Sequence, residues 1–318
     1  MPATPVADFV RFDAEHLAPL PHPSGADLQS RNSARFQQHS RYISDLRMRL
    51  LLVSLLVLAP VHAQWIKYPT GGVPKTADGK PNLTAPAPRT ADGKPDFSGM
   101  WLPNDELPCP KMILDDAGTC AERVLPSRQA ANIAFGVPGG LPFRPAARQL
   151  QEKRAASGSS EDPHTHCLPS NFPKLYTFPH ITKIVQTPRL MVMLNEFNAS
   201  YRQIFTDGRP LPVDPNPSWN GYSSGKWEGS QLVVETIGFR DDLWMDASGT
   251  PLTNGARVTE RIRRPNFGSL EIEAIVDDPK AYTRPWTINM KMKIVLDTEL
   301  IDEVCLEGER SLEHLTGR

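Results

Sequence analysis

The chain has 318 residues and carries 35 Lys and Arg against 36 Asp and Glu, so its formal net charge at neutral pH is −1. This balance excludes the broad basic surface that is typical of nucleic-acid-binding domains, and we expect no nucleic-acid partner. The 32 prolines and 21 glycines predict many short connections and few long helices.

The N-terminal part of the chain has the pattern of an export signal. Arg49 gives a positive start, residues 50–60 are apolar, and small residues follow. This pattern is typical of a secretory signal peptide at residues 48–63, whose apolar run is too short to span a membrane. We therefore expect a secreted or periplasmic protein with no membrane span in the mature chain. Residues 1–47 are expected to be a disordered extension that is not translated when synthesis starts at Met48.

Residues 64–96 are interpreted as a linker. The sequence Thr-Ala-Asp-Gly-Lys-Pro occurs twice in it, at residues 76–81 and 90–95. Gly can adopt positive φ and Pro cannot continue a strand, so each copy predicts a tight turn. The remainder, residues 97–318, is expected to form a single β domain.

The first part of that domain combines one strand, irregular chain and one helix. Gly99 and Trp101 form a Gly-x-Trp motif that resembles the first strand of lipocalins. Residues 102–145 are rich in Pro and are expected to wrap the outside. Residues 145–157 begin with Pro, contain good helix formers and precede Gly158, so they predict one short helix.

From Ile181 onward, short segments alternate between apolar and polar residues, as strands with one buried face do. The alternation is clearest in residues 286–296, and it recurs in residues 257–263 and 270–276. The last strand is expected near residues 301–306. Seven or eight such strands predict an all-β fold, which is an antiparallel β-barrel or a strongly twisted, lipocalin-like sandwich.

All four cysteines, Cys109, Cys120, Cys167 and Cys305, follow the predicted cleavage point. An even number of cysteines in an exported chain predicts two disulfides. Of the three possible pairings we favour Cys109–Cys120, which closes a short loop, with Cys167–Cys305, which ties the start of the barrel to its last strand.

Glu260 is the most informative single residue. Period-two alternation places it on the apolar side of a strand, and Glu196 is in a similar position. A carboxylate that faces a core must be paired or protonated. We favour an ion pair with an inward arginine such as Arg202, Arg240 or Arg284 over a general acid–base role. If the chain is an enzyme, the candidate catalytic residues are Glu260, Glu196, Arg202 and Tyr201.

A second set of residues is suited to holding a small molecule or a metal. The candidate ligand-binding residues are Gln203, Trp219, Tyr222, Trp227 and Trp286, which offer one interior polar anchor and aromatic faces for stacking. His164 and His166 stand two apart, and His180 or acidic residues would have to complete a metal site in three dimensions. Because no second ligand pair follows at a typical spacing, we expect neither a metal nor a cofactor.

Several motifs together resemble a family of uncharacterised exported bacterial proteins. They are the Asp-Gly-Lys-Pro-Asp-Phe-Ser-Gly-x-Trp segment at 92–101, Phe-Thr-Asp-Gly-Arg at 205–209, Trp-Asn-Gly-Tyr-Ser at 219–223 and Gly-Lys-Trp-Glu-Gly at 225–229. The resemblance spans about residues 90 to 313 and implies export and a single domain, but no activity. Relatives often carry His-Ser-Glu in a loop where residues 252–255 here read Leu-Thr-Asn-Gly, so a mechanism based on that histidine is not expected here.

Three functions fit these patterns. The first is an exported protein that binds a small, partly apolar molecule inside the barrel. The second is a periplasmic hydrolase or lyase that uses a buried carboxylate. The third is a cell-envelope interaction protein with a solid core. An open or a filled barrel interior distinguishes the first from the third.

Overall fold

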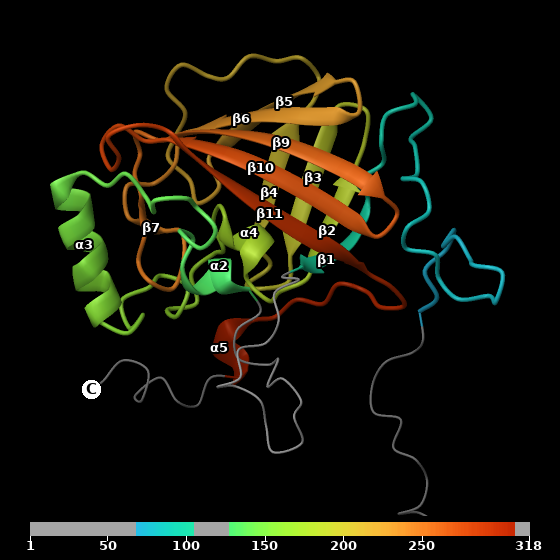
Figure 1. Cartoon of the computed structure of the whole chain (residues 1–318), viewed down its shortest axis with the longest axis horizontal. Helices are drawn as coiled ribbons and strands as arrows, with labels where there is room; N and C mark the ends of the chain where they lie inside the picture. Colours follow the sequence, from blue (N-terminus) through green and yellow to red (C-terminus); the bar gives the residue numbers. More distant parts are fainter. Residues whose placement is uncertain (1–67, 105–126, 309–318) are drawn as a thin grey trace, which may run out of the picture. The chain divides into compact units, whose positions relative to one another are not determined.

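Nine strands close into a barrel in the computed structural model of the protein, which describes residues 68–104 and 127–308 (Figure 1). Around the barrel, the strands follow one another in the order β1 (Gly99–Pro103), β11 (Trp286–Val295), β10 (Ser269–Asp277), β9 (Arg257–Asn266), β6 (Gln231–Ile237), β5 (Tyr222–Glu228), β4 (Tyr201–Phe205), β3 (Leu190–Asn195) and β2 (Thr182–Gln186), which pairs again with β1. The predicted all-β barrel is confirmed.

One neighbouring pair departs from the predicted antiparallel arrangement. Strands β4 and β5 run parallel, with Ile204 opposite Ser223 and Phe205 opposite Ser224. The long connection of residues 206–221 makes this possible, because it returns the chain to the end of the barrel at which β4 began. The other barrel neighbours are antiparallel.

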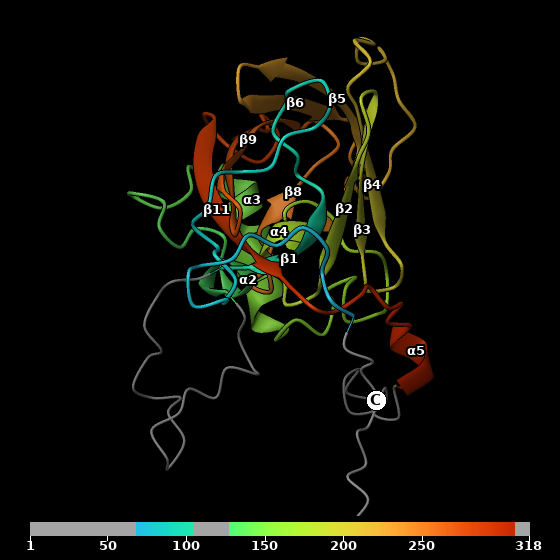
Figure 2. The same ribbon diagram turned by 90° about the vertical axis from the view of Figure 1, so that its right-hand side faces the viewer.

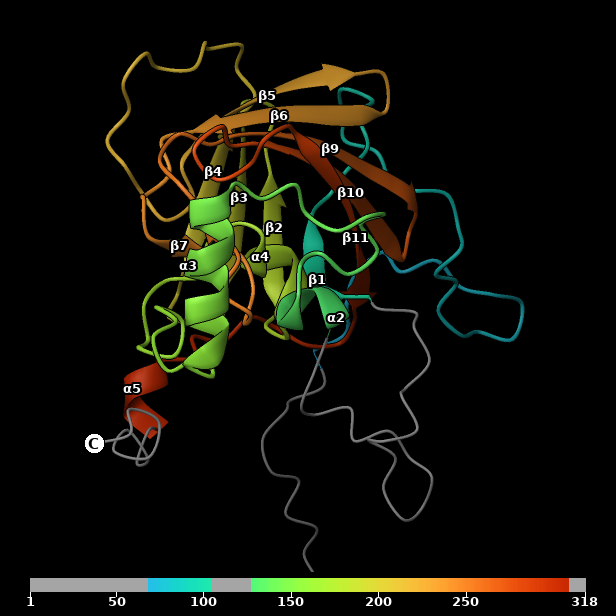
Figure 3. The same ribbon diagram turned by 60° about the vertical axis from the view of Figure 1, so that its left-hand side comes forward.

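The helices of the described residues are short and lie outside the sheet or at one end of the barrel (Figure 3). Helix α3 (Pro145–Ala156) has Pro at its start, as predicted, and Ser157 caps its end. Helix α2 (Arg128–Ala131) packs near α4 (Lys174–Thr177), and α4 also contacts β1 and β11. The two-stranded sheet of β7 (Leu243–Trp244) and β8 (Pro251–Leu252) is separate from the barrel.

Inward-facing side chains fill the barrel. The predicted inner faces of β9, β10 and β11 are confirmed, since Val258, Ala274 and Ile288 are at most 2% exposed. Inner residues of other strands, such as Met193 and Val234, are 0% exposed. A ligand-sized cavity lined by these side chains would leave them surface that water could reach. The described interior is therefore a packed core of the kind that small barrels have.

Two predicted interior positions are wrong, those of Gln203 on β4 and of Glu196 after β3. Gln203 is exposed and Tyr201 is 60% exposed, so both point out of the barrel. Arg202 alternates with them and points inward, being 1% exposed. Glu196 follows the end of β3 and is half-buried, so it is not an interior anchor either.

The C-terminal part of the described chain is not a barrel strand. Glu303 forms one parallel bridge with Phe197, and Cys305 begins a short helix, α5 (Cys305–Gly308). The predicted disulfide Cys167–Cys305 is confirmed, with 5.5 Å between the Cα atoms. It ties this segment to the chain that precedes α4, whereas the bridge with Phe197 joins it to the loop after β3.

Other predictions concern the linker and the termini. Both copies of the repeat form the predicted turn, with Gly79 and Gly93 at φ values of 82° and 78°. In Figure 2 this segment runs beside the barrel. The pair Cys109–Cys120, the extension 1–47 and the signal peptide 48–63 lie outside the described residues. Within those residues, no helix has the length and apolar character needed to cross a membrane.

Candidate functional site

The predicted inward carboxylate of Glu260 meets an arginine. Glu260 is 0% exposed on β9, and its carboxylate forms an ion pair with the guanidinium of Arg202 on β4. Nη1 of Arg202 lies 3.0 Å from Oε1 of Glu260, and Nη2 donates to Oε2. The contact is therefore bidentate, which is the strongest geometry for an arginine and a carboxylate. This geometry favours the interpretation of Glu260 as a member of an ion pair over a general acid–base role.

Tyr176 of α4 completes the pair from the end of the barrel. Its hydroxyl donates to Oε1 of Glu260 at 2.7 Å and accepts from Nη1 of Arg202 at 2.9 Å. Sequence reasoning missed this residue, because a four-residue helix between prolines and a strand gives no periodic signal. The aromatic residue predicted beside Arg202 was Tyr201, which lies on the outer face.

Two hydroxyl groups satisfy the remaining nitrogens of Arg202. Ser223 and Thr236 are directly opposite each other on β5 and β6, with 2.9 Å between their hydroxyl oxygens. Nε of Arg202 donates to Ser223 at 3.2 Å, and Nη2 donates to Thr236 at 2.9 Å. Every polar group of Glu260 and Arg202 is thus engaged, as a buried charge requires.

The electrostatics follow from burial and from this pairing. Burial lowers the pKa of Arg202, but the charge of Glu260 and the hydrogen bonds outweigh burial and raise it above the usual value. Burial, followed by the charge of Glu260, raises the pKa of Tyr176 well above its usual range. The arginine stays charged and the phenol stays protonated at ordinary pH. Arg202, Tyr176 and Glu260 are each at most 2% exposed, so in the described part of the chain they form a structural contact inside the barrel.

The predicted aromatic ligand residues do not gather at one place. Trp286 is buried at the start of β11. Cross-strand pairing through β10, β9 and β6 places it level with Ser223, near the start of β5. Trp227 is four residues further along β5 and packs on Phe97, with ring centres 5.2 Å apart. Tyr222 stacks on Phe205, and Trp219 lies beneath Arg240. They serve separate parts of the barrel and cannot line a common mouth.

The predicted histidines are partly brought together. His164 and His180 are adjacent, with ring centres 5.6 Å apart, whereas Nε2 of His166 contacts the carbonyl oxygen of Ser160 at 2.7 Å. The residues that could hold a metal ion are His180, Glu196 and Glu303, whose donor atoms lie within 4.8 Å of one another. Burial lowers the pKa of His180, and burial raises that of Glu196.

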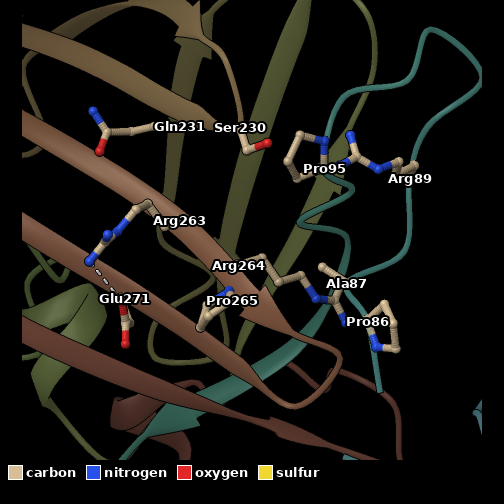
Figure 4. A pocket seen from close by; sticks show the side chains of 10 residues that line it. All are labelled: Pro86, Ala87, Arg89, Pro95, Ser230, Gln231, Arg263, Arg264, Pro265 and Glu271. Atoms are coloured by element: carbon tan, nitrogen blue, oxygen red, sulfur yellow. Dashed lines mark hydrogen bonds and ion pairs between the residues drawn. The ribbon is translucent and has the colours of Figure 1, made fainter. Parts of the chain in front are cut away.

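A hollow of about 490 Å³ lies outside the barrel, between the linker, the end of β9 and the turn that joins β5 to β6. Figure 4 shows Arg89 from the linker side, with Arg263 and Arg264 from β9. Arg263 pairs with Glu271 at 2.9 Å. The walls also contain prolines, Ser230 and Gln231.

Arg264 fixes the geometry of this hollow. Its Nη1 donates to the carbonyl of Asp96 at 2.6 Å and its Nη2 to that of Phe267 at 2.5 Å, so it joins the linker to the hairpin. Burial lowers its pKa to about 10. Its Nε is buried without a partner among the described residues. Three arginines and one glutamate therefore give the hollow an excess of positive charge.

A scan against protein-family models finds no match for this chain, and a search of curated proteins finds no similar sequence. Its function is therefore inferred from its own geometry.

Proposed function

We propose that this chain is an exported binding protein whose barrel is a solid scaffold and whose ligand, a small anion with an apolar part, occupies the outer hollow of Arg89 and Arg263. The observation that carries the proposal is the contrast between a filled interior and a positively charged hollow of about 490 Å³. The ligand is still expected to be small and partly apolar, but its proposed binding site is on the surface of the barrel and not in the interior.

The interior offers the ligand no room and no free anchor. Glu260 and Arg202 satisfy each other, and the side chains beside them have almost no exposed surface. A ligand there would have to displace a buried ion pair, which is costly. For the same reason Glu260 is not available as the base of a hydrolase or lyase.

The hollow combines cationic hydrogen-bond donors for the anionic group of such a ligand with apolar walls for its remainder. Arg89 and Arg263 are exposed and present guanidinium donors, which match the geometry of carboxylate and phosphate groups. Pro86, Pro95 and Pro265 supply rigid apolar walls. Arg264 adds positive charge while its hydrogen bonds hold it in place. A neutral analogue of the ligand is expected to bind more weakly.

Export is the second part of the proposal. The signal-peptide pattern at 48–63 supports it, and the Cys167–Cys305 disulfide is compatible with an oxidising compartment. Expression of the full coding sequence in a bacterial host, followed by N-terminal sequencing of the periplasmic fraction, is expected to return a chain that begins at Gln64. A mature chain that keeps residues before Met48, or one confined to the cytoplasm, would contradict export.

The binding test compares two arginines of the same strand. Arg263 pairs with Glu271 beside the hollow, and Arg257 pairs with Glu235 at the other end of β9. With benzoate, phenyl phosphate and neutral benzyl alcohol as probes, we expect the anions to bind best. Arg263→Gln should weaken anion binding about tenfold, the worth of one charge-assisted hydrogen bond, and Arg257→Gln should leave it unchanged. Equal affinities in both variants, or a preference for benzyl alcohol, would overturn the proposal.

A filled barrel also fits the third function, a cell-envelope interaction protein with a solid core. In that case the same hollow would receive an acidic side chain of a partner. Anion probes of one ring would then bind no better than inorganic phosphate, and cross-linking in intact cells would recover a partner from the wild type but not from Arg263→Gln.

A further inference from the structure

Three segments that are distant in sequence converge beside the Cys167–Cys305 disulfide. His180 precedes β2, Glu196 follows β3, and Glu303 belongs to the C-terminal segment. One donor atom from each lies within 4.8 Å of the other two. Nδ1 of His180 is 3.1 Å from Oε2 of Glu303.

The backbone holds this cluster firmly. Phe197 and Glu303 form a parallel bridge, in which the Glu303 amide donates to the carbonyl of Glu196 at 2.8 Å and the Asn198 amide donates to that of Glu303 at 2.7 Å. The disulfide at Cys305 follows two residues later. The cluster is therefore fixed by main-chain bonds and a covalent link rather than by exposed side chains alone.

Among the described residues, neither carboxylate forms an ion pair with a Lys or Arg side chain. Oε1 of Glu196 accepts the amide of Ile181 at 2.7 Å, which leaves its second oxygen for another partner. Within the described residues, the ion pair recorded for Glu303 is the one with His180. Since a neutral imidazole cannot compensate two negative charges, a cation at this point would be attracted by both carboxylates.

A neighbouring histidine gives an independent sign of an occupant. The ring of His164 stacks on Phe197 with centres 3.9 Å apart and lies 5.6 Å from the ring of His180. Its Nδ1 is buried and has no hydrogen-bond partner among the described residues. A buried imidazole nitrogen without a partner is uncommon and points to an ordered water or ion that would complete it.

We propose that His180, Glu196 and Glu303 bind one divalent transition-metal ion, with Zn²⁺ as the best fit, and that the ion joins the C-terminal segment to the loop after β3. One imidazole nitrogen with two carboxylate oxygens suits Zn²⁺, which takes these ligands in sites of low coordination number. Ca²⁺ is a poorer fit, because it requires six to eight oxygen ligands. A fourth position remains for water.

The site is accessible enough to load. The side chain of Glu303 is 52% exposed, and that of His180 is 15% exposed. The cluster therefore lies at the surface, so chelator treatment and reloading should not require unfolding. This inference is independent of the anion site proposed above.

The test measures metal binding directly on the exported chain, purified without a histidine tag and dialysed against a chelator. Isothermal titration with ZnCl₂ is expected to give one ion per chain and a raised thermal midpoint, with CaCl₂ at least 100-fold weaker. His180→Gln and Glu303→Gln should each weaken Zn²⁺ binding at least tenfold. Loss of a residue that hydrogen-bonds to a metal ligand costs about 10- to 100-fold in affinity, and loss of the ligand itself should cost at least as much. Glu228→Gln, an exposed carboxylate of β5, is the matched control and should bind as wild type.

Other readouts keep the result unambiguous. Circular dichroism of the metal-free variants should match that of the wild type, since Glu303 is largely exposed and its removal should not unfold the barrel. The Co²⁺ derivative should show visible ligand-field bands without thiolate charge transfer. Stoichiometry far below one, unchanged affinity in both ligand variants, or a thiolate spectrum would each overturn the proposal.

Discussion

Arg202 of β4 and Glu260 of β9 form an ion pair across the barrel interior, although β5 and β6 separate their strands in the sheet. Ser223 of β5 and Thr236 of β6 bind the same guanidinium. The four strands are therefore joined by side chains as well as by backbone pairing. Tyr176 extends the connection to α4, which lies at one end of the barrel.

The first prediction concerns loss of the carboxylate charge. Glu260→Gln leaves Arg202 buried without its counter-ion, and breaking a buried pair in this way costs about 3–5 kcal/mol of unfolding free energy. Glu273→Gln, on the outer side of β10, is the control and should change stability by less than about 0.5 kcal/mol. Urea unfolding measures both. If the two variants lose the same stability, the ion pair contributes little to the fold.

The second prediction distinguishes the net contribution of the ion pair to stability from the loss of stability when only one partner is removed. Replacing both members, in Arg202→Met with Glu260→Leu, removes both buried charges and keeps apolar volume. Ser223 and Thr236 then still bond each other, and Tyr176 retains the sulfur of Met193 at 3.6 Å. The double variant should be more stable than either single variant, because apolar replacement of a buried pair is often neutral or better. A double-mutant cycle in which the losses simply add would contradict this coupling.

The sequence was sufficient to place Glu260 but not to place its partner with certainty. Alternation on β9 is strict, since Arg257, Arg261 and Arg263 could not all be buried, so Glu260 had to point inward. On β4 the aromatic ends, Tyr201 and Phe205, suggested the opposite face from the one that is buried. A five-residue strand with an inward arginine carries too little periodicity to correct this.

Other features depend on contacts that no local pattern encodes. The parallel contact of β4 with β5 follows from the path of residues 206–221, not from either strand. His180, Glu196 and Glu303 are brought together by three separate segments, so their spacing in sequence carries no ligand signature. The Cys167–Cys305 pair was predictable, because exported chains with few cysteines pair them and the choices were few.

The third prediction concerns alkaline pH. Burial and the charge of Glu260 raise the pKa of Tyr176, so the folded protein keeps a proton that the unfolded chain releases near pH 10. Stability from this group is present below about pH 10 and is lost as pH rises further. Tyr176→Phe should therefore flatten the fall in thermal midpoint between pH 9 and pH 11, whereas Tyr201→Phe, on the outer face, should not. Because Tyr176 keeps its proton in the folded protein, ultraviolet titration should count as many ionising phenols in folded Tyr176→Phe as in the folded wild type.

The fourth prediction concerns the disulfide that fixes the C-terminal segment. Cys167 and Cys305 are 138 residues apart, and the chain-entropy model gives up to about 5 kcal/mol for closing a loop of that length. The double variant Cys167→Ser with Cys305→Ser should thus lose more stability than Cys109→Ser with Cys120→Ser, whose predicted short loop is worth about 3 kcal/mol. Denaturant unfolding of the oxidised proteins measures the difference. Because the barrel does not use residues 303–308 as a strand, far-ultraviolet circular dichroism should remain that of a β protein in both. A greater loss for the short loop would mean that the long loop is already constrained in the unfolded chain.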